Sequence, residues 1–250
     1  MSDRVQKQRG RAGNRQRYGE LEATTCNLTL AVEPDNGSDD QEVGDTVTPF
    51  ATIARAALRL QDNLWHKVRI LISPGSDPST ILGAARLRGK IRVAKGGSLA
   101  LIGVGEPVVL EDEIEVTDLT EADPRVTIAA VNAGTWAGYF LRIAVGKDAG
   151  AIMPILSCDE TGFVTRNEAP LPEIGDTVEV VKPAVEWSAD QVAIDLEDSA
   201  ADEARLLLAN MTIDLSESTD ATPLVLRCNG SENGVQLQFV RILLPEGGEQ

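Results

Sequence analysis

The sequence predicts a mostly β protein whose short aliphatic strands wind, coil by coil, into a parallel solenoid. The first observation is spacing: apolar stretches centred on Ile70, Ile91, Val109 and Ile128 lie 21, 18 and 19 residues apart. A period near twenty residues with several short strands per interval is typical of solenoids. The second observation is that aromatic residues make up only 4% of the chain. This favours inward rows of aliphatic side chains over a β-sandwich, which also has short strands.

Composition limits the classes of partner. The 250 residues are enough for one domain, or one domain with a modest insertion. Their net charge is −16, and an acidic surface repels phosphate backbones, which argues against nucleic acid as a main partner. We expect no membrane span, because no apolar run reaches about 18 residues. The first twenty residues are hydrophilic and do not resemble a secretion signal, so we expect the protein to be made in the cytosol and not to leave by that route.

The N-terminal segment, residues 1–25, differs from the rest in charge. Its first twenty residues hold six basic side chains and two acidic ones, and the body behind them is strongly acidic. The segment has too few large apolar residues to pack a core of its own. Two interpretations stay open, a solvated tail and an arm that becomes ordered on an acidic partner surface. The candidate anchoring residues are Arg4, Lys7, Arg9, Arg11, Arg15 and Arg17.

A helix is predicted over residues 49–60, within a segment 26–66 that also contains the first strand. Thr48 suits the N-cap, and Pro49 suits the first helical position, where its missing N–H is harmless. Apolar residues then recur at helical spacing on one face, at Phe50, Ile53, Ala57 and Leu60.

The remaining chain divides into two predicted solenoid parts, residues 67–131 and 189–250, around an insertion at 132–188. The insertion breaks the spacing of the apolar stretches and contains two of the three tryptophans, Trp136 and Trp187. Its alternating stretches at 140–143, 153–155, 163–164 and 178–180 indicate a small antiparallel β-domain. Solenoids tolerate such insertions because each coil contacts only its neighbours.

The opening of the body resembles the start of right-handed parallel β-helix proteins of the pectate-lyase-like class, which are found in phage tail spikes. There a strand leads into a D-x-x-N-G-S-D turn, and a P-F-x-T-I-x-x-A helix then caps the end of the solenoid. The residues that carry this resemblance are 32–40, Gly44, 48–53 and 56–58, although Ala31-Val32-Glu33-Pro34 departs from the usual Tyr-Val-Asp-Pro. The resemblance implies a right-handed β-helix capped by Pro49, Phe50, Ile53, Ala57 and Leu60.

The insertion also resembles small β-modules of phage structural proteins, through Trp136, a turn at 146–150, Ile155 and the stretch 175–181. Together the resemblances imply a non-enzymatic structural protein of a tailed-phage virion or a related particle, as a tail spike, fibre or adaptor. They imply a homotrimer at the particle surface, whose arm docks on an acidic site of other virion subunits and which can contact a host-surface glycan. The alternative is a polysaccharide depolymerase or lyase, because the same fold hosts both.

No catalytic, cofactor-binding or metal-ligating residue is predicted. The single histidine, His66, has no nucleophile motif near it, and runs of carboxylates in so acidic a chain indicate solvated turns. Calcium at Asp35, Asp39 and Asp40 is a weaker alternative to plain turn chemistry, because their spacing is not that of an EF-hand. The three cysteines lack metal spacing and are interpreted as buried, reduced thiols: Cys26, Cys158 and Cys228.

Overall fold

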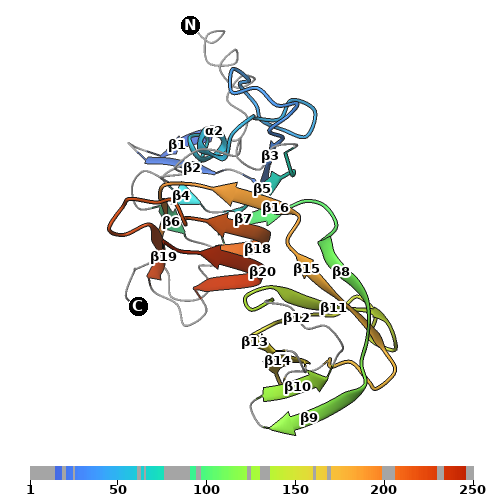
Figure 1. Ribbon diagram of the computed structural model, residues 1–250. Helices are drawn as coiled ribbons and strands as arrows, with labels where there is room; N and C mark the ends of the chain where they lie inside the picture. The colour runs from blue at the N-terminus through green and yellow to red at the C-terminus, as the bar shows by residue number, and fades with distance from the viewer. Residues whose placement is uncertain are drawn as a thin grey trace, which may run out of the picture. The chain divides into compact units, whose positions relative to one another are not determined.

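The protein is mostly β and divides into two compact units (Figure 1). Unit 1 comprises Met1–Gly105 and Val185–Gln250, and unit 2 comprises Glu106–Ala184. The computed structural model describes residues 15–18, 21–24, 26–60, 63–64, 66–75, 91–93, 97–122, 125–129, 136–159, 162–167, 170–198, 206–229 and 234–245. Among these residues no helix is long and apolar enough to cross a membrane.

Unit 1 contains two parallel sheets. Sheet A is built, in spatial order, from β1 (Arg15–Tyr18), β2 (Leu21–Thr24), β4 (Asn63–Leu64), β6 (Ile91–Val93), β17 (Val192–Asp198) and β19 (Leu224–Asn229). Sheet B is built from β3 (Leu28–Val32), β5 (Lys67–Ile72), β7 (Ser98–Gly103), β18 (Leu206–Asp214) and β20 (Val235–Leu243), with β16 (Val185–Ser188) also beside β18. Every pairing in the two sheets is parallel except that of β1 with β2.

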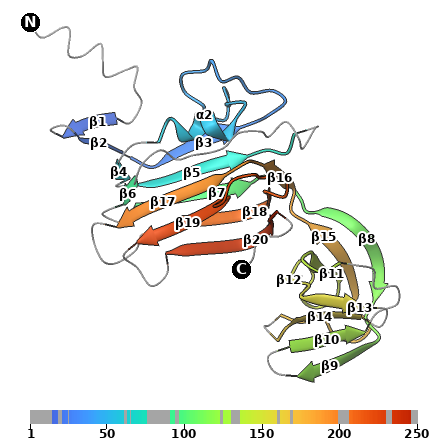
Figure 2. The same ribbon diagram turned by 60° about the vertical axis from the view of Figure 1, so that its left-hand side comes forward.

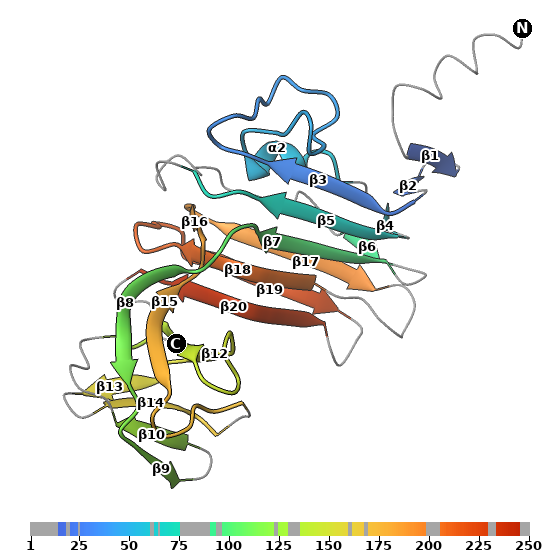
Figure 3. The same cartoon turned by 90° about the vertical axis from the view of Figure 1, so that its right-hand side faces the viewer.

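The chain alternates between the two sheets, so that each pass adds one strand to sheet A and then one to sheet B (Figures 2 and 3). We call each such pair of strands a rung; the five rungs are β2/β3, β4/β5, β6/β7, β17/β18 and β19/β20. Inward side chains of both sheets meet in a single core, which explains the alternation of buried and exposed residues along β5. The predicted parallel, rung-by-rung arrangement is therefore present, and no hydrogen-bonded closure joins the two sheets among the described residues.

The third rung is interrupted and then resumed. The first half of β18 pairs with β7, and Met211–Asp214 of its second half pairs with β16. Between the halves, Asn210 has a φ of 52°, and its side-chain Nδ2 donates to the carbonyl oxygens of Gly103 and Gly105, each at 3.0 Å. The chain thus leaves the rung after β7, forms unit 2, and returns in β16 to complete the same rung.

Unit 2 is the antiparallel β-domain that the alternating stretches predicted. One sheet has the order β12 (Ile152–Pro154), β11 (Phe140–Val145), β15 (Thr177–Lys182), β8 (Val108–Glu115). The other has the order β13 (Ser157–Asp159), β14 (Gly162–Arg166), β10 (Arg125–Ala129), β9 (Asp118–Ala122). Its core is separate from that of unit 1 and contains Leu141, Ile143 and Phe163.

Several strand assignments made from spacing are wrong. Val109 and Ile128, predicted in solenoid coils, instead belong to unit 2. Val109 lies on β8, which pairs antiparallel with β15, and Ile128 lies on β10, which pairs antiparallel with β9 and β14. Trp187, predicted in the insertion, lies on β16 and is fully buried in the core of unit 1. The period near twenty is also wrong, because Ile70 and Ile91 lie in different sheets and the true partner of Ile70 in the next rung is Leu101.

Candidate functional site

The candidate site is the segment that covers the outer edge of β3, residues 33–60, where backbone and side-chain hydrogen bonds are concentrated. We call this segment the cap. Its backbone pairs with the strand: Phe50 N donates to Ala31 O at 2.9 Å, and Glu33 N donates to Phe50 O at 2.8 Å. Ala31 N donates to Gly44 O at 2.8 Å. Backbone groups of the outermost sheet-B strand, which would otherwise be free to pair with another chain, are therefore satisfied by the cap.

The cap also extends the apolar core. Phe50 is completely buried, and Ile53 and Ala56 of the helix α2 (Ile53–Ala57) lie in the same core as Leu30 and other inward residues of the sheets. Of the other predicted cap residues, Pro49 is buried, Ala57 is half-buried, and Leu60 is partly buried against this core. Of these five residues, Phe50, Ile53 and Leu60 thus belong to or pack against the core of unit 1.

The helix is shorter than predicted and begins later. Its N-cap is Thr52, whose Oγ1 accepts from Arg55 N at 3.1 Å. Thr48, the predicted N-cap, instead donates through its N and Oγ1 to the Asp45 carboxylate. The physical reason is that Phe50 forms a parallel bridge with Val32, so its backbone is extended and cannot join the first helical turn.

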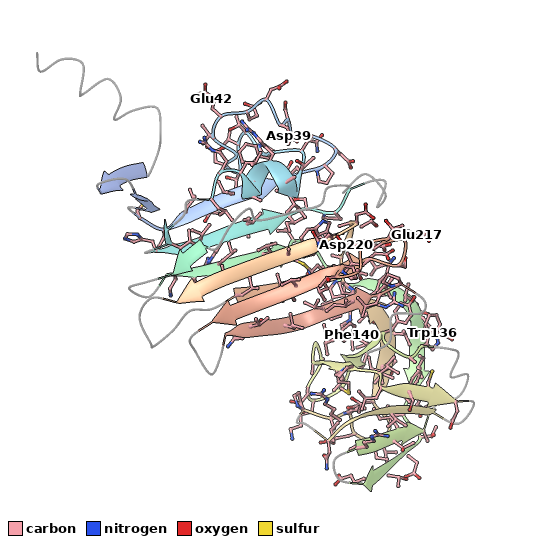
Figure 4. All side chains as sticks on the ribbon, turned by 90° about the vertical axis from the view of Figure 1, so that its left-hand side faces the viewer. Asp39, Glu42, Trp136, Phe140, Glu217 and Asp220 are labelled. Carbon is pink, nitrogen blue, oxygen red and sulfur yellow. The ribbon has the colours of Figure 1, made fainter. Side chains whose placement is uncertain are left out.

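Asp39 links the loop to the start of the helix (Figure 4). Its Oδ1 accepts from Ala51 N and Thr52 N, both at 3.0 Å, and its Oδ2 accepts from Thr52 Oγ1 at 2.7 Å. Spacing alone did not reveal this role, because Asp39 lies twelve or more residues from its partners. The calcium alternative gains no support: no group of three metal-ligating side chains is found in the described part of the chain.

Asp45 stabilises the turn that follows Gly44. The backbone amides of Thr48 and Val47 and the Thr48 hydroxyl donate to its Oδ1 at 2.8 to 3.0 Å. These hydrogen bonds, first those from the backbone of Thr48 and Val47, hold the pKa of the Asp45 carboxyl below its ordinary value. The turn therefore favours the ionised carboxylate.

Glycine is required at position 44 for two independent reasons. Gly44 has a φ of +67°, in the region that side chains disfavour. A Cβ atom built on it would lie 1.8 Å from Cε2 of the Phe50 ring. The Arg55 guanidinium covers that ring at 5.7 Å from its centroid, and its Nη2 donates to Gln41 O. Gly44, Phe50 and Arg55 thus form one packed unit over the edge of the sheet.

The structure describes only part of the predicted arm. Arg15 and Arg17 lie on β1, which pairs with β2 at the edge of sheet A, whereas Arg4, Lys7, Arg9 and Arg11 lie outside the described residues. Residues 15–18 and 21–24 therefore belong to the sheet, although they fall within the segment 1–25 that was predicted as an arm.

No arrangement typical of catalysis is found among the described residues. His66 is half-buried beside β5, and its carbonyl oxygen accepts from Ser98 N of the next rung. The carboxylates Glu217 and Asp220 lie in the loop that connects β18 to β19 (Figure 4). In unit 2 the side chains of Trp136 and Tyr139 meet edge to face at 5.6 Å and pack against the core. Both rings contribute to the packing of unit 2. The prediction that the cysteines are buried is wrong for Cys26, which is exposed, and Cys158 is only partly buried against the core of unit 2.

No protein-family model matches the chain, and neither a curated protein nor a solved structure does.

Proposed function

We propose that the chain is a non-enzymatic structural protein of a tailed-phage virion or a related particle, as a tail spike, fibre or adaptor, with unit 1 as a right-handed parallel β-helix. The observation that carries the proposal is the rung-by-rung pairing of unit 1 beneath a cap on β3. The residues that resemble the opening of tail-spike β-helices, such as Gly44 and Phe50, occupy this cap.

Two further observations support a structural role. The Asp39 carboxylate, one of the three residues of the calcium alternative, accepts hydrogen bonds from the cap itself. Trp187, which could have offered a stacking surface for a sugar, is buried in the core. Both residues stabilise the scaffold, which favours an architectural role over the depolymerase alternative.

In this proposal the basic N-terminal segment anchors the protein to an acidic site on other virion subunits, and the body forms a homotrimer that can contact a host-surface glycan. The segment carries basic side chains in an otherwise acidic chain, so attraction to the particle would come from this segment and not from the body. Residues 1–14 are the part to alter, because residues 15–18 pair within sheet A.

The anchoring role is tested by charge reversal in particles that carry the tagged protein. The variant with Arg4→Glu, Lys7→Glu, Arg9→Glu and Arg11→Glu should fold normally by circular dichroism but be lost from purified particles. The matched control, with Arg4→Lys, Arg9→Lys and Arg11→Lys, keeps the charge and should be incorporated. Normal incorporation of the reversed variant would show that this segment is not the anchor.

The virion assignment and the absence of enzymatic activity need their own measurements. Antibody labelling of intact particles in electron micrographs should place the protein on the tail or the particle surface. Incubation of the purified protein with host capsular polysaccharide or lipopolysaccharide should leave the sugar length unchanged. Shortened or unsaturated products would establish the depolymerase or lyase alternative instead.

A further inference from the structure

The cap covers the edge of β3 by means of one short loop, residues 44–50, which we call the strap. The two ends of the strap bind the same residue of the strand: Ala31 N donates to Gly44 O at 2.8 Å, and Phe50 N donates to Ala31 O at 2.9 Å. Both backbone groups of Ala31 are therefore satisfied only while the two ends of the strap stay in place.

Two carboxylates hold the strap in this shape. Asp45, directly after Gly44, accepts three hydrogen bonds of 2.8 to 3.0 Å from the residues two and three positions further along the strap. Asp39 accepts three hydrogen bonds of 2.7 to 3.0 Å from Ala51 and Thr52, which directly follow the strap. Asp39 is exposed and Asp45 is only half-buried, so both carboxylates can exchange protons with the solvent.

The apolar side chains of the cap divide into a few that are buried and several that are exposed. Phe50 and Ile53 are buried in the core of unit 1, whereas Val43, Val47 and Leu58 are 55%, 84% and 60% exposed. A segment with few buried apolar contacts opens locally more easily than the sheets behind it. The hydrogen bonds to the two carboxylates therefore matter for keeping the cap closed.

The other charged groups of the cap do not replace these bonds. The strand β3 has no charged residue, and the Arg55 guanidinium lies over the Phe50 ring and donates to Gln41 O. Neutralising the remaining carboxylates would reduce repulsion within the cap, which favours the closed state. The charged residues of the cap besides Asp39 and Asp45 are Glu33, Asp35, Asp40, Glu42, Arg55 and Arg59.

We propose that the cap is an acid-sensitive lid over the edge of β3, which opens as one unit when Asp39 and Asp45 are protonated while the two sheets stay paired. A protonated carboxyl is a weaker acceptor than a carboxylate, so the strap loses the bonds that hold its ends together. The buried residues of the core between the sheets are all apolar, so their burial involves no proton. Opening frees the backbone of Ala31 to pair with another strand.

The sign of the pH dependence follows from Asp45. Its pKa is below the ordinary 3.8 in the closed cap, because the backbone of Thr48 and Val47 donates to its carboxylate. The open cap therefore binds this proton more tightly, and opening becomes more favourable as the pH falls from 3.8 through the lowered pKa. The lid goes beyond the proposed virion role and does not depend on it.

The test is amide hydrogen exchange of the full chain, measured by NMR from about pH 6 to about pH 3 and divided by the exchange rate of an unfolded chain at each pH. The protection of the Ala31 and Phe50 amides should fall at the acid end, by up to about tenfold per pH unit for each carboxylate that takes up a proton on opening. The protection of amides in β5 and β18 should stay constant over the same range.

A pair of double variants separates the bonds from the charge. Asp39→Asn with Asp45→Asn should lower the protection of Ala31 and Phe50 by about tenfold or more at neutral pH and remove most of its pH dependence. The matched control, Asp40→Asn with Glu42→Gln, removes the same charge from exposed residues of the cap and should behave as the wild type.

Three results would overturn the proposal: wild-type protection of Ala31 and Phe50 that does not change with pH, an equal loss of protection in β5 and β18, or an equal loss in the control variant. The first result would show that the cap does not respond to acid, and the second would show that unit 1 unfolds as a whole. If the Asp39 and Asp45 double variant does not fold, the wild-type series decides between these outcomes.

Discussion

The sharpest test of the cap is the substitution Gly44→Ala. A methyl group at this position would lie 1.8, 2.2 and 2.4 Å from three carbon atoms of the Phe50 ring, where ordinary contacts between carbon atoms are about 3.5–4.0 Å. The ring is completely buried and its backbone is hydrogen-bonded to β3, so it cannot move away without exposing the edge of the sheet. The backbone φ of +67° adds a second, independent cost.

The expected loss of stability follows from these two contributions. A side chain in the left-handed region costs about 1–2 kcal/mol. Overpacking of a filled core adds about 1–3 kcal/mol. The free energy of unfolding should therefore fall by about 2–5 kcal/mol, which lowers Tm by about 4–20 °C in a unit of this size.

Thermal and urea unfolding followed by circular dichroism would measure this loss, and Phe50→Ala supplies the matched background. In the absence of the ring, Gly44→Ala should cost only the backbone contribution of about 1–2 kcal/mol. The difference between the two backgrounds is the contact energy between Gly44 and the ring. An equal cost in both backgrounds would refute the packing explanation, and no cost in either would refute the cap geometry itself.

Substitutions at Asn210, Asp39 and Asp45 test three other features of unit 1. Asn210→Gly keeps the positive φ but removes the two bonds to Gly103 O and Gly105 O, so unfolding experiments should show a loss of about 1–3 kcal/mol. Asn210→Ala should cost about 1–2 kcal/mol more, because alanine disfavours that φ. Asp39→Ala should destabilise the protein by about 1–3 kcal/mol in urea, whereas Asp40→Ala, on an exposed residue whose backbone N bonds Ser38 Oγ, should have little effect. The lowered pKa of Asp45 means that the unfolded chain binds more protons at pH values between that pKa and the ordinary 3.8, so stability rises with pH in this range and is lost as the pH falls through the lowered pKa. Asp45→Asn should remove this part of the pH dependence of urea unfolding, and an unchanged acid profile would contradict the assignment.

Local patterns predicted many of the strands correctly. The alternation of Val68, Ile70 and Ile72 identified β5, and similar alternation identified β11 and β15 of the antiparallel domain. Such predictions succeed because a strand places alternate side chains on opposite faces, so its buried side is encoded within a few residues.

The spacing of apolar stretches along the sequence did not identify which strands pair with each other. Consecutive rungs are set 40, 31 and 29 residues apart at Leu30–Ile70, Ile70–Leu101 and Leu208–Leu237, so no constant period exists in the sequence. Val109 fits the supposed period of about twenty only by coincidence, because the strand pairing places it in unit 2. Loops of variable length are tolerated in a solenoid, since only the strands must stay in register.

Within the cap, too, local patterns were predicted from the sequence and contacts with distant residues were not. The resemblance implied that residues such as Phe50 and Ile53 cover one end of the unit, and the sequence predicted a helix over residues 49–60 with Thr48 as its N-cap. In the structure the N-cap of this helix is Thr52, because the backbone of Phe50 pairs with Val32, which lies 18 residues earlier on a strand. The roles of Asp39 and Asn210 were missed for the same reason, because their partners lie far along the chain.

By itself, the sequence determined the β character of the chain, the faces of its strands and the apolar residues of its cap. These follow from short-range alternation and from the free energy of burying aliphatic side chains. The tertiary structure alone decided which strands share a rung, where the chain leaves and rejoins the third rung, and that Leu237 is left exposed when its row partners are buried. Each of these depends on pairing between distant segments, whose energy is distributed over two sheets and cannot be assigned from any local pattern.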